Sequence, residues 1–137
     1  MSGELSHHEA LIYIMVTMSA VDRKMTDQEL SSIGDMVSKL PVFQDFETDT
    51  LVKVAEACGE VLSSEGGLDK VLTRVSRALP PKLRETAYAL AVEIAAADLD
   101  VQPEEMRLLE LLAEQLNLDR LITAAIERGA RARLAKA

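Results

Sequence analysis

The sequence predicts an all-α protein: a single-domain bundle of about seven helices, with two pseudo-symmetric helix–loop–helix halves around two central apolar helices. Hydrophobic side chains recur at helical spacing along most of the chain, and no segment alternates with the two-residue period of a strand. The chain also repeats itself once, with residues 9–40 returning as about 85–116. Its 137 residues, 48% of them hydrophobic, suit one domain with its own core, so we treat 1–137 as a single unit.

The repeat begins with a short acidic motif. Residues 20–29 return as 96–105, an offset of 76 residues that carries Asp22 onto Asp98 and Glu29 onto Glu105. The apolar positions that follow keep the same register: Leu30, Ile33, Met36, Val37 and Leu40 correspond to Met106, Leu109, Leu112, Ala113 and Leu116. Two copies of one unit predict two loops of similar geometry, each with the same carboxylates.

Four helices are expected before the chain enters the second copy. Thr26 is a typical N-cap residue for the second of them, and Pro41 ends that helix. The Gly66-Gly67 pair ends the third, and Pro80-Pro81 ends the fourth. The expected ranges are about 5–22, 26–40, 50–64 and 68–79.

Three further helices complete the chain, at about 81–98, at about 103–117, and from Leu118 or Asp119 into the tail. The first and fifth helices are apolar nearly all round, apart from Glu93, and helices of this kind lie in the middle of a fold. The tail carries cations that suit either a solvated helix C-terminus or an anion site: Arg128, Arg131, Arg133 and Lys136.

Composition excludes several classes of function. A net charge of −8 and an aromatic content of 3% argue against a nucleic-acid surface, which needs basic groups and stacking rings. The single cysteine, Cys58, cannot form an intrachain disulfide and lies in an apolar helical stretch, where a small buried thiol is common. No signal-peptide pattern begins the chain, and its longest apolar run, 10–21, is about half a membrane span. We therefore expect a cytoplasmic protein without membrane insertion.

The carboxylates of the two loops have a structural interpretation. Thr26 and Glu29 have the spacing of a capping box, in which each side chain binds the other residue's backbone N–H. Gln102 and Glu105 form a weaker version, with Pro103 at the first helical position, where its missing N–H is not needed. Capping alone would account for both motifs.

The same loops also have the composition of a hard-cation site, because calcium and magnesium take clustered carboxylate and carbonyl oxygens. The second loop is the better candidate, since Arg23 and Lys24 offset the charge of the first. The candidate ligands are Asp22, Glu29, Asp98, Asp100 and Glu105. Capping alone and capping with a bound calcium or magnesium ion both remain open.

These loops resemble the tellurite-resistance TerB family. The shared pattern is an Ala-x-Asp at the end of a helix, an apolar residue three positions later and a Glu seven positions after the Asp, present twice. The resemblance covers about residues 9–118 and extends to modules at the N-terminus of some membrane-anchored J-domain co-chaperones. It implies an all-helical fold of two similar halves and an acidic surface proposed to bind metal, with the acidic positions at Asp22, Glu29, Asp98 and Glu105.

This chain departs from the family pattern directly after each Asp. The family usually has Gly there, whereas this sequence has Arg23 and Leu99. Because Gly permits a close backbone approach to a ligand, its replacement at both loops weakens the metal hypothesis.

The sequence favours a binding protein over an enzyme. It offers no Ser/His/Asp set, no HExxH and no phosphate-binding Gly loop. Catalysis by Glu93 would need a polar pocket around it, and Arg84 and Lys82 are its candidate partners. The methionines at helical spacing are predicted to fill the core: Met15, Met18, Met25, Met36 and Met106.

The resemblance therefore implies a non-enzymatic accessory protein of tellurite resistance or stress response, acting by protein interaction, with divalent-cation binding at its acidic loops. The alternative is a metal-free interaction scaffold whose carboxylates are purely structural. The expected partner is a protein, for which the Lys/Arg-bearing cytoplasmic face of a membrane protein or a second copy of the chain are the candidates.

Overall fold

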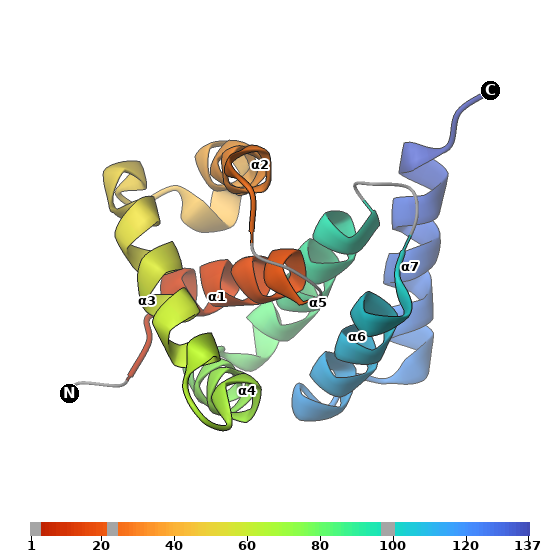
Figure 1. The fold of residues 1–137 in the computed structure, drawn as a ribbon. Coiled ribbons are helices and arrows are strands. Elements are labelled where there is room, and N and C mark those ends of the chain that lie inside the picture. Colours follow the sequence, from red (N-terminus) through yellow and green to blue (C-terminus); the bar gives the residue numbers. More distant parts are fainter. Residues whose placement is uncertain (1–3, 22–24, 97–100) are drawn as a thin grey trace.

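A computed structural model describes residues 4–21, 25–96 and 101–137 of the chain. Within these residues all regular secondary structure is helical, which confirms the predicted fold class (Figure 1). The first half holds α1 (His7–Ala20), α2 (Asp27–Lys39), α3 (Leu51–Ser63) and α4 (Gly67–Ala78). The second half holds α5 (Pro81–Ala96), α6 (Pro103–Gln115) and α7 (Arg120–Leu134).

The observed helices are slightly shorter than predicted. Helix α1 begins at His7 rather than Leu5, because Ser6 and Glu9 form a capping box at its start. Helix α7 begins after Asp119, whose side chain accepts the N–H of Leu121. Two short 3₁₀ helices, η1 (Pro41–Phe43) and η2 (Thr48–Thr50), were not expected between α2 and α3. The predicted ends at Asp22 and Asp98 lie outside the described residues.

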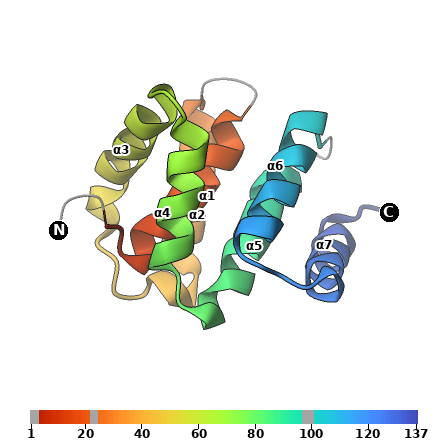
Figure 2. The same cartoon turned by 90° about the horizontal axis from the view of Figure 1, so that it is seen from below.

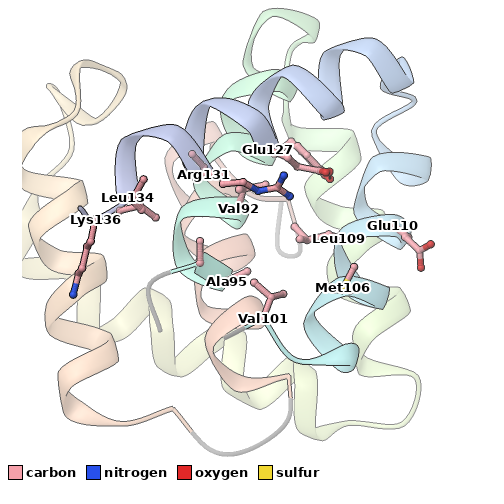
Figure 3. Close-up of a pocket in the computed structure, with 14 residues that line it drawn as sticks. Val92, Ala95, Val101, Met106, Leu109, Glu110, Glu127, Arg131, Leu134 and Lys136 are labelled. Carbon is pink, nitrogen blue, oxygen red and sulfur yellow. Dashed lines mark hydrogen bonds between the residues drawn. The ribbon is translucent and has the colours of Figure 1, made fainter. Parts of the chain in front are cut away.

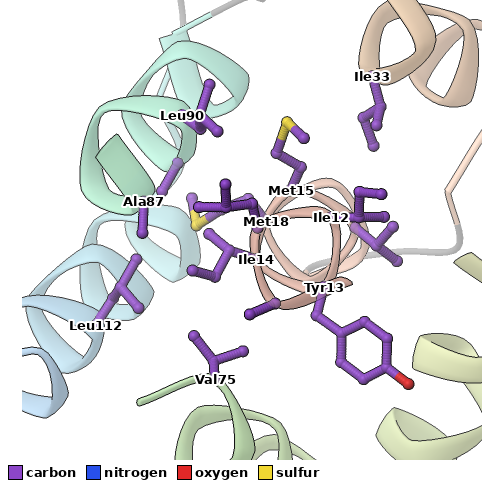
Figure 4. Close-up of a cluster of buried hydrophobic side chains, with 14 of the residues drawn as sticks. Ile12, Tyr13, Ile14, Met15, Met18, Ile33, Val75, Ala87, Leu90 and Leu112 are labelled. Atoms are coloured by element: carbon purple, nitrogen blue, oxygen red, sulfur yellow. The ribbon is translucent and has the colours of Figure 1, made fainter. Parts of the chain in front are cut away.

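Helix α1 is the centre of the fold. Ten consecutive residues, from Ala10 to Ser19, are buried, and the helix contacts α2, α3, α4 and α5. Its side chains point outward in all directions, Ile12 toward Ile33 of α2 and Met18 toward Ala87 of α5 (Figure 4). The buried hydroxyl of Thr17 donates to the backbone oxygen of Tyr13 at 2.7 Å, so this polar group has a partner.

Helix α5 is the second central helix, and it packs against α1, α6 and α7 (Figures 1 and 2). It buries six side chains: Ala87, Tyr88, Leu90, Ala91, Val92 and Ala95. The prediction that two apolar helices lie in the middle, covered by amphipathic ones, is therefore confirmed. Among the described residues, no helix is both long and apolar enough to cross a membrane.

The two halves have similar contacts, whose donors but not acceptors are related by the offset of 76 residues. The Nε2–H of His8 on α1 donates to the backbone oxygen of Val42, at 2.8 Å, just after α2. At the equivalent position on α5, Nη1 of Arg84 donates to the backbone oxygen of Leu116, at 3.1 Å, just after α6. In each half a long polar side chain of the central helix thus holds the chain segment that leaves the next helix.

Candidate functional site

Both acidic corners use their Glu residue as a helix cap. At the start of α2, the N–H of Thr26 donates to Oε1 of Glu29 at 2.8 Å, and the N–H of Glu29 donates to the Thr26 hydroxyl at 3.1 Å. At the start of α6, the N–H of Gln102 donates to Oε1 of Glu105 at 2.9 Å. The capping interpretation is therefore correct for Glu29 and Glu105, and the corners are alike in this respect.

The other three candidate ligands, Asp22, Asp98 and Asp100, lie outside the described residues. Among the residues that the structure describes, no three His, Cys, Asp or Glu side chains gather as metal ligands do. Calcium or magnesium binding at the corners stays a prediction.

Replacing Glu105 with Ala is expected to lower the free energy of unfolding by about 1 kcal/mol, because the Gln102 N–H loses its acceptor. Glu104→Ala is the matched control, since it removes a carboxylate from the same turn and should cost about 0.3 kcal/mol through the helix dipole alone. Urea unfolding, with calcium and with a chelator, measures the free energy of unfolding of both variants. A loss at Glu105 that appears only with calcium would show a metal ligand instead of a cap.

Glu93 does not have the partners suggested by the sequence. Its carboxylate pairs with Arg133 of α7, whereas Arg84 binds the backbone oxygen of Leu116. The prediction that Arg84 or Lys82 would be the partner missed Arg133 because α7 crosses α5, a tertiary contact that the repeat does not encode. Glu93 therefore helps to hold α7 on α5.

An apolar groove of about 710 Å³ runs between α6 and α7, with α5 as its floor (Figure 3). This volume lies within the usual range for ligand and partner pockets. Most of the side chains along it are aliphatic: Val92, Ala95, Met106, Leu109, Ala130 and Leu134. The prediction that Met106 fills the core is wrong, because this side chain is 58% exposed at the groove.

The two walls of the groove carry opposite charge. Helix α6 has four Glu and one Arg, a net charge of −3, whereas α7 has four Arg and one Glu, a net charge of +3. Among the lining residues, α6 contributes Glu110, which pairs with Arg107 of the same helix, and the α7 side contributes Glu127, Arg131 and Lys136 (Figure 3). The groove is therefore an apolar surface between an acidic edge and a basic edge.

One polar contact fixes the basic wall to the floor. The hydroxyl of Tyr88, on α5, donates to Oε2 of Glu127, on α7, at 2.5 Å. Burial and this hydrogen bond to a carboxylate raise the pKa of Tyr88 above its ordinary value. Together with the Glu93–Arg133 pair, this contact holds α7 against α5. These polar contacts matter because Ala130 is the one buried residue of α7.

The equivalent surface in the first half is closed. Leu30 is partly buried where Met106 is exposed, and Ile33 is 0% exposed where Leu109 is only partly buried. The 41–50 connection, with η1 and η2, packs against α2 and α3. In the second half the connection is only 116–119.

A single repeat position helps to explain the difference. Gly34 of α2 faces α3, and an added Cβ would make an ordinary van der Waals contact with Cδ2 of Leu51, at 3.6 Å. Its counterpart on α6 is Glu110, which lines the groove. The first pair of helices thus has a small residue at this position, whereas the second pair has a charged side chain. The Gly34–Glu110 difference and the unequal connections were the sequence signals for the groove.

Comparison with known proteins gives one family. The family model described as "Tellurite resistance protein TerB" matches residues 8–127, most of the chain. No curated protein and no solved structure gives a match.

Proposed function

Because the chain belongs to the TerB family of tellurite resistance proteins, we propose that it is a non-enzymatic accessory protein that binds a protein partner in the groove between α6 and α7. The observation that carries this proposal is the exposure of Met106 and Leu109 at positions whose first-half counterparts are better covered. Exposed apolar side chains rimmed by polar groups are typical of interaction surfaces.

The described residues also favour binding over catalysis. Three of the titratable groups that line the groove are engaged in structural contacts: Tyr88 binds Glu127, and Glu110 pairs with Arg107 of its own helix. Glu93, the one carboxylate considered for catalysis, pairs with Arg133. In this proposal the capping carboxylates Glu29 and Glu105 stiffen the corners, and a divalent cation there would add to that role. The location is the cytoplasm, with the cytoplasmic segment of a membrane protein as one class of partner.

Met106→Glu is expected to abolish this function without unfolding the protein. The new carboxylate would lie in the apolar groove, where a partner could bind only by desolvating the charge. Cells that lack their own copy of the gene should regain growth on tellurite with the wild-type chain and not with Met106→Glu.

Val52→Glu is the matched control for this experiment. Val52 is an exposed aliphatic residue of α3, 52% exposed, and does not line the groove. This variant should restore growth, and both variants should melt within a few degrees of the wild type, because exposed substitutions change stability by only about 0.5 kcal/mol. Growth restored by Met106→Glu would rule out the groove, and no rescue by the wild type would rule out the tellurite role.

A further inference from the structure

We infer that the occupant of the groove is an amphipathic helix of another protein, with an apolar stripe flanked by basic residues on one side and by acidic residues on the other. This inference rests on the proposed function and names the chemistry of its partner. It follows from the shape of the groove and from the side chains of its walls.

The walls admit few other modes of peptide recognition. All three elements around the groove are helices, whose backbone groups are bonded internally, so no sheet edge is available for an added strand. Grooves for proline-rich peptides are lined with aromatic rings, whereas Tyr88 is the single aromatic residue among those that line this one. A groove with aliphatic walls from two helices and a floor from a third is the kind of surface on which an amphipathic helix binds.

The length of the groove matches a short helical stripe. On α7 the lining extends from Glu127 to Leu134, which is eight residues and about 10 Å along the helix axis. A partner helix covers this distance with apolar residues at i, i+3, i+4 and i+7. These side chains would meet Met106 and Leu109 on one wall and Leu134 on the other.

The first half has a longer connection between its corresponding helices. There the 41–50 segment adds its own apolar residue, Phe43, which is 2% exposed. Its 3₁₀ helices contact both α2 and α3. The second half has only the short 116–119 connection in place of this segment.

The opposite charges of the walls specify the flanks of the partner. Lys or Arg on one flank would face Glu110 of α6, and Asp or Glu on the other flank would face Arg131 and Lys136 beside α7. A helix with the same charge on both flanks would meet one wall of like charge. Complementary charges at the rim select partners more than they add affinity.

Three designed peptides test this inference. Each is a stapled alanine-based helix of about four turns with leucines at i, i+3, i+4 and i+7. One has Lys on one flank and Glu on the other, the second has Lys on both flanks, and the third has Glu on both. Fluorescence anisotropy measures the dissociation constant of each for the full chain. The Lys/Glu peptide is expected to bind about fivefold more tightly than either of the others.

Variants then locate the binding and reverse its preference. Met106→Glu should abolish binding of all three peptides, and Val52→Glu should leave it unchanged. Arg131→Glu makes the lining of both walls acidic, so it should bind the Lys/Lys peptide more tightly than the Lys/Glu peptide. High salt should reduce the differences between the dissociation constants of the three peptides, because it screens charges. The contribution of the leucines to affinity should remain.

Several outcomes would overturn the inference: no binding, binding that Met106→Glu leaves intact, or peptide preferences that Arg131→Glu leaves unchanged. A dimer in sedimentation that Met106→Glu dissociates would make a second copy the occupant, and tight uptake of a fatty acid without peptide binding would make it a small molecule. If the peptides fail while Met106→Glu still abolishes tellurite resistance, the proposed function stands and only the helical partner is wrong.

Discussion

Replacing Gly67 with Ala is expected to lower the free energy of unfolding by about 3 kcal/mol, although the substitution adds one methyl group. Gly67 is the first residue of α4, at the point where α4 crosses the end of α3. An added Cβ would lie 2.5 Å from the backbone oxygen of Leu62 and still closer to that of Val61. Both oxygens belong to the last turn of α3, so relief requires moving a helix rather than rotating a side chain.

Gly59→Ala provides the control for this prediction. Gly59 lies in the middle of α3, and a Cβ there would meet no other atom within 4 Å. Alanine should therefore stabilise the protein by up to about 1 kcal/mol through its better helix propensity. Thermal unfolding should show a melting temperature roughly 10 °C lower for Gly67→Ala and slightly higher for Gly59→Ala. Equal melting temperatures would mean that α3 and α4 are less closely packed at their crossing than the structure indicates.

The Gly66-Gly67 pair shows how far local signals determine this fold. From the sequence it is predicted to end the third helix, whereas in the structure α3 already ends at Ser63 and the pair begins α4. The structure gives the two residues different roles: Gly66 adopts a left-handed conformation with φ of 66°, and Gly67 permits a close crossing of two helices. The first role is local and follows from glycine chemistry. The second role depends on how α4 packs on α3, which neighbouring residues in the sequence do not predict.

The same distinction applies to the candidate site. The capping roles of Glu29 and Glu105 were predictable, because a capping box depends on residues three apart on one helix. The Glu93–Arg133 pair and the groove were not predicted, because each depends on where α7 lies relative to α5 and α6. The repeat predicted the two corners because both halves have the same capping residues there. It could not predict the groove, because the two halves have different structures at that place.

Raising the pH from 9 to 11 is expected to destabilise the protein through Cys58, whose thiol is 0% exposed. Its Sγ lies 3.6 Å from the backbone oxygen of Tyr13 and 3.7 Å from the Thr17 hydroxyl, with no cation bound to it among the described residues. Burial raises the pKa of this thiol from 9.0 to about 11, and the hydrogen bond to Thr17 offsets only part of this effect.

The sign follows from the difference between the two states. In the unfolded chain the thiol loses its proton near pH 9, whereas the folded chain retains it up to about pH 11. The unfolded state therefore binds fewer protons in this window, and stability falls as pH rises. Below pH 9 the contribution is fully present. By pH 11 the loss should reach about 2 kcal/mol, and the raised pKa of Tyr88 adds a further loss above pH 10.

Cys58→Ala isolates the thiol, because the loss of protons from other groups is common to both proteins. Urea unfolding at intervals from pH 8 to pH 11 should show the wild type losing about 2 kcal/mol more than Cys58→Ala. The thiolate absorbance of the folded wild type should rise near pH 11, and that of the unfolded chain near pH 9. Parallel loss of stability in the two proteins would show that the thiol titrates freely in the fold, and would contradict its burial against α1.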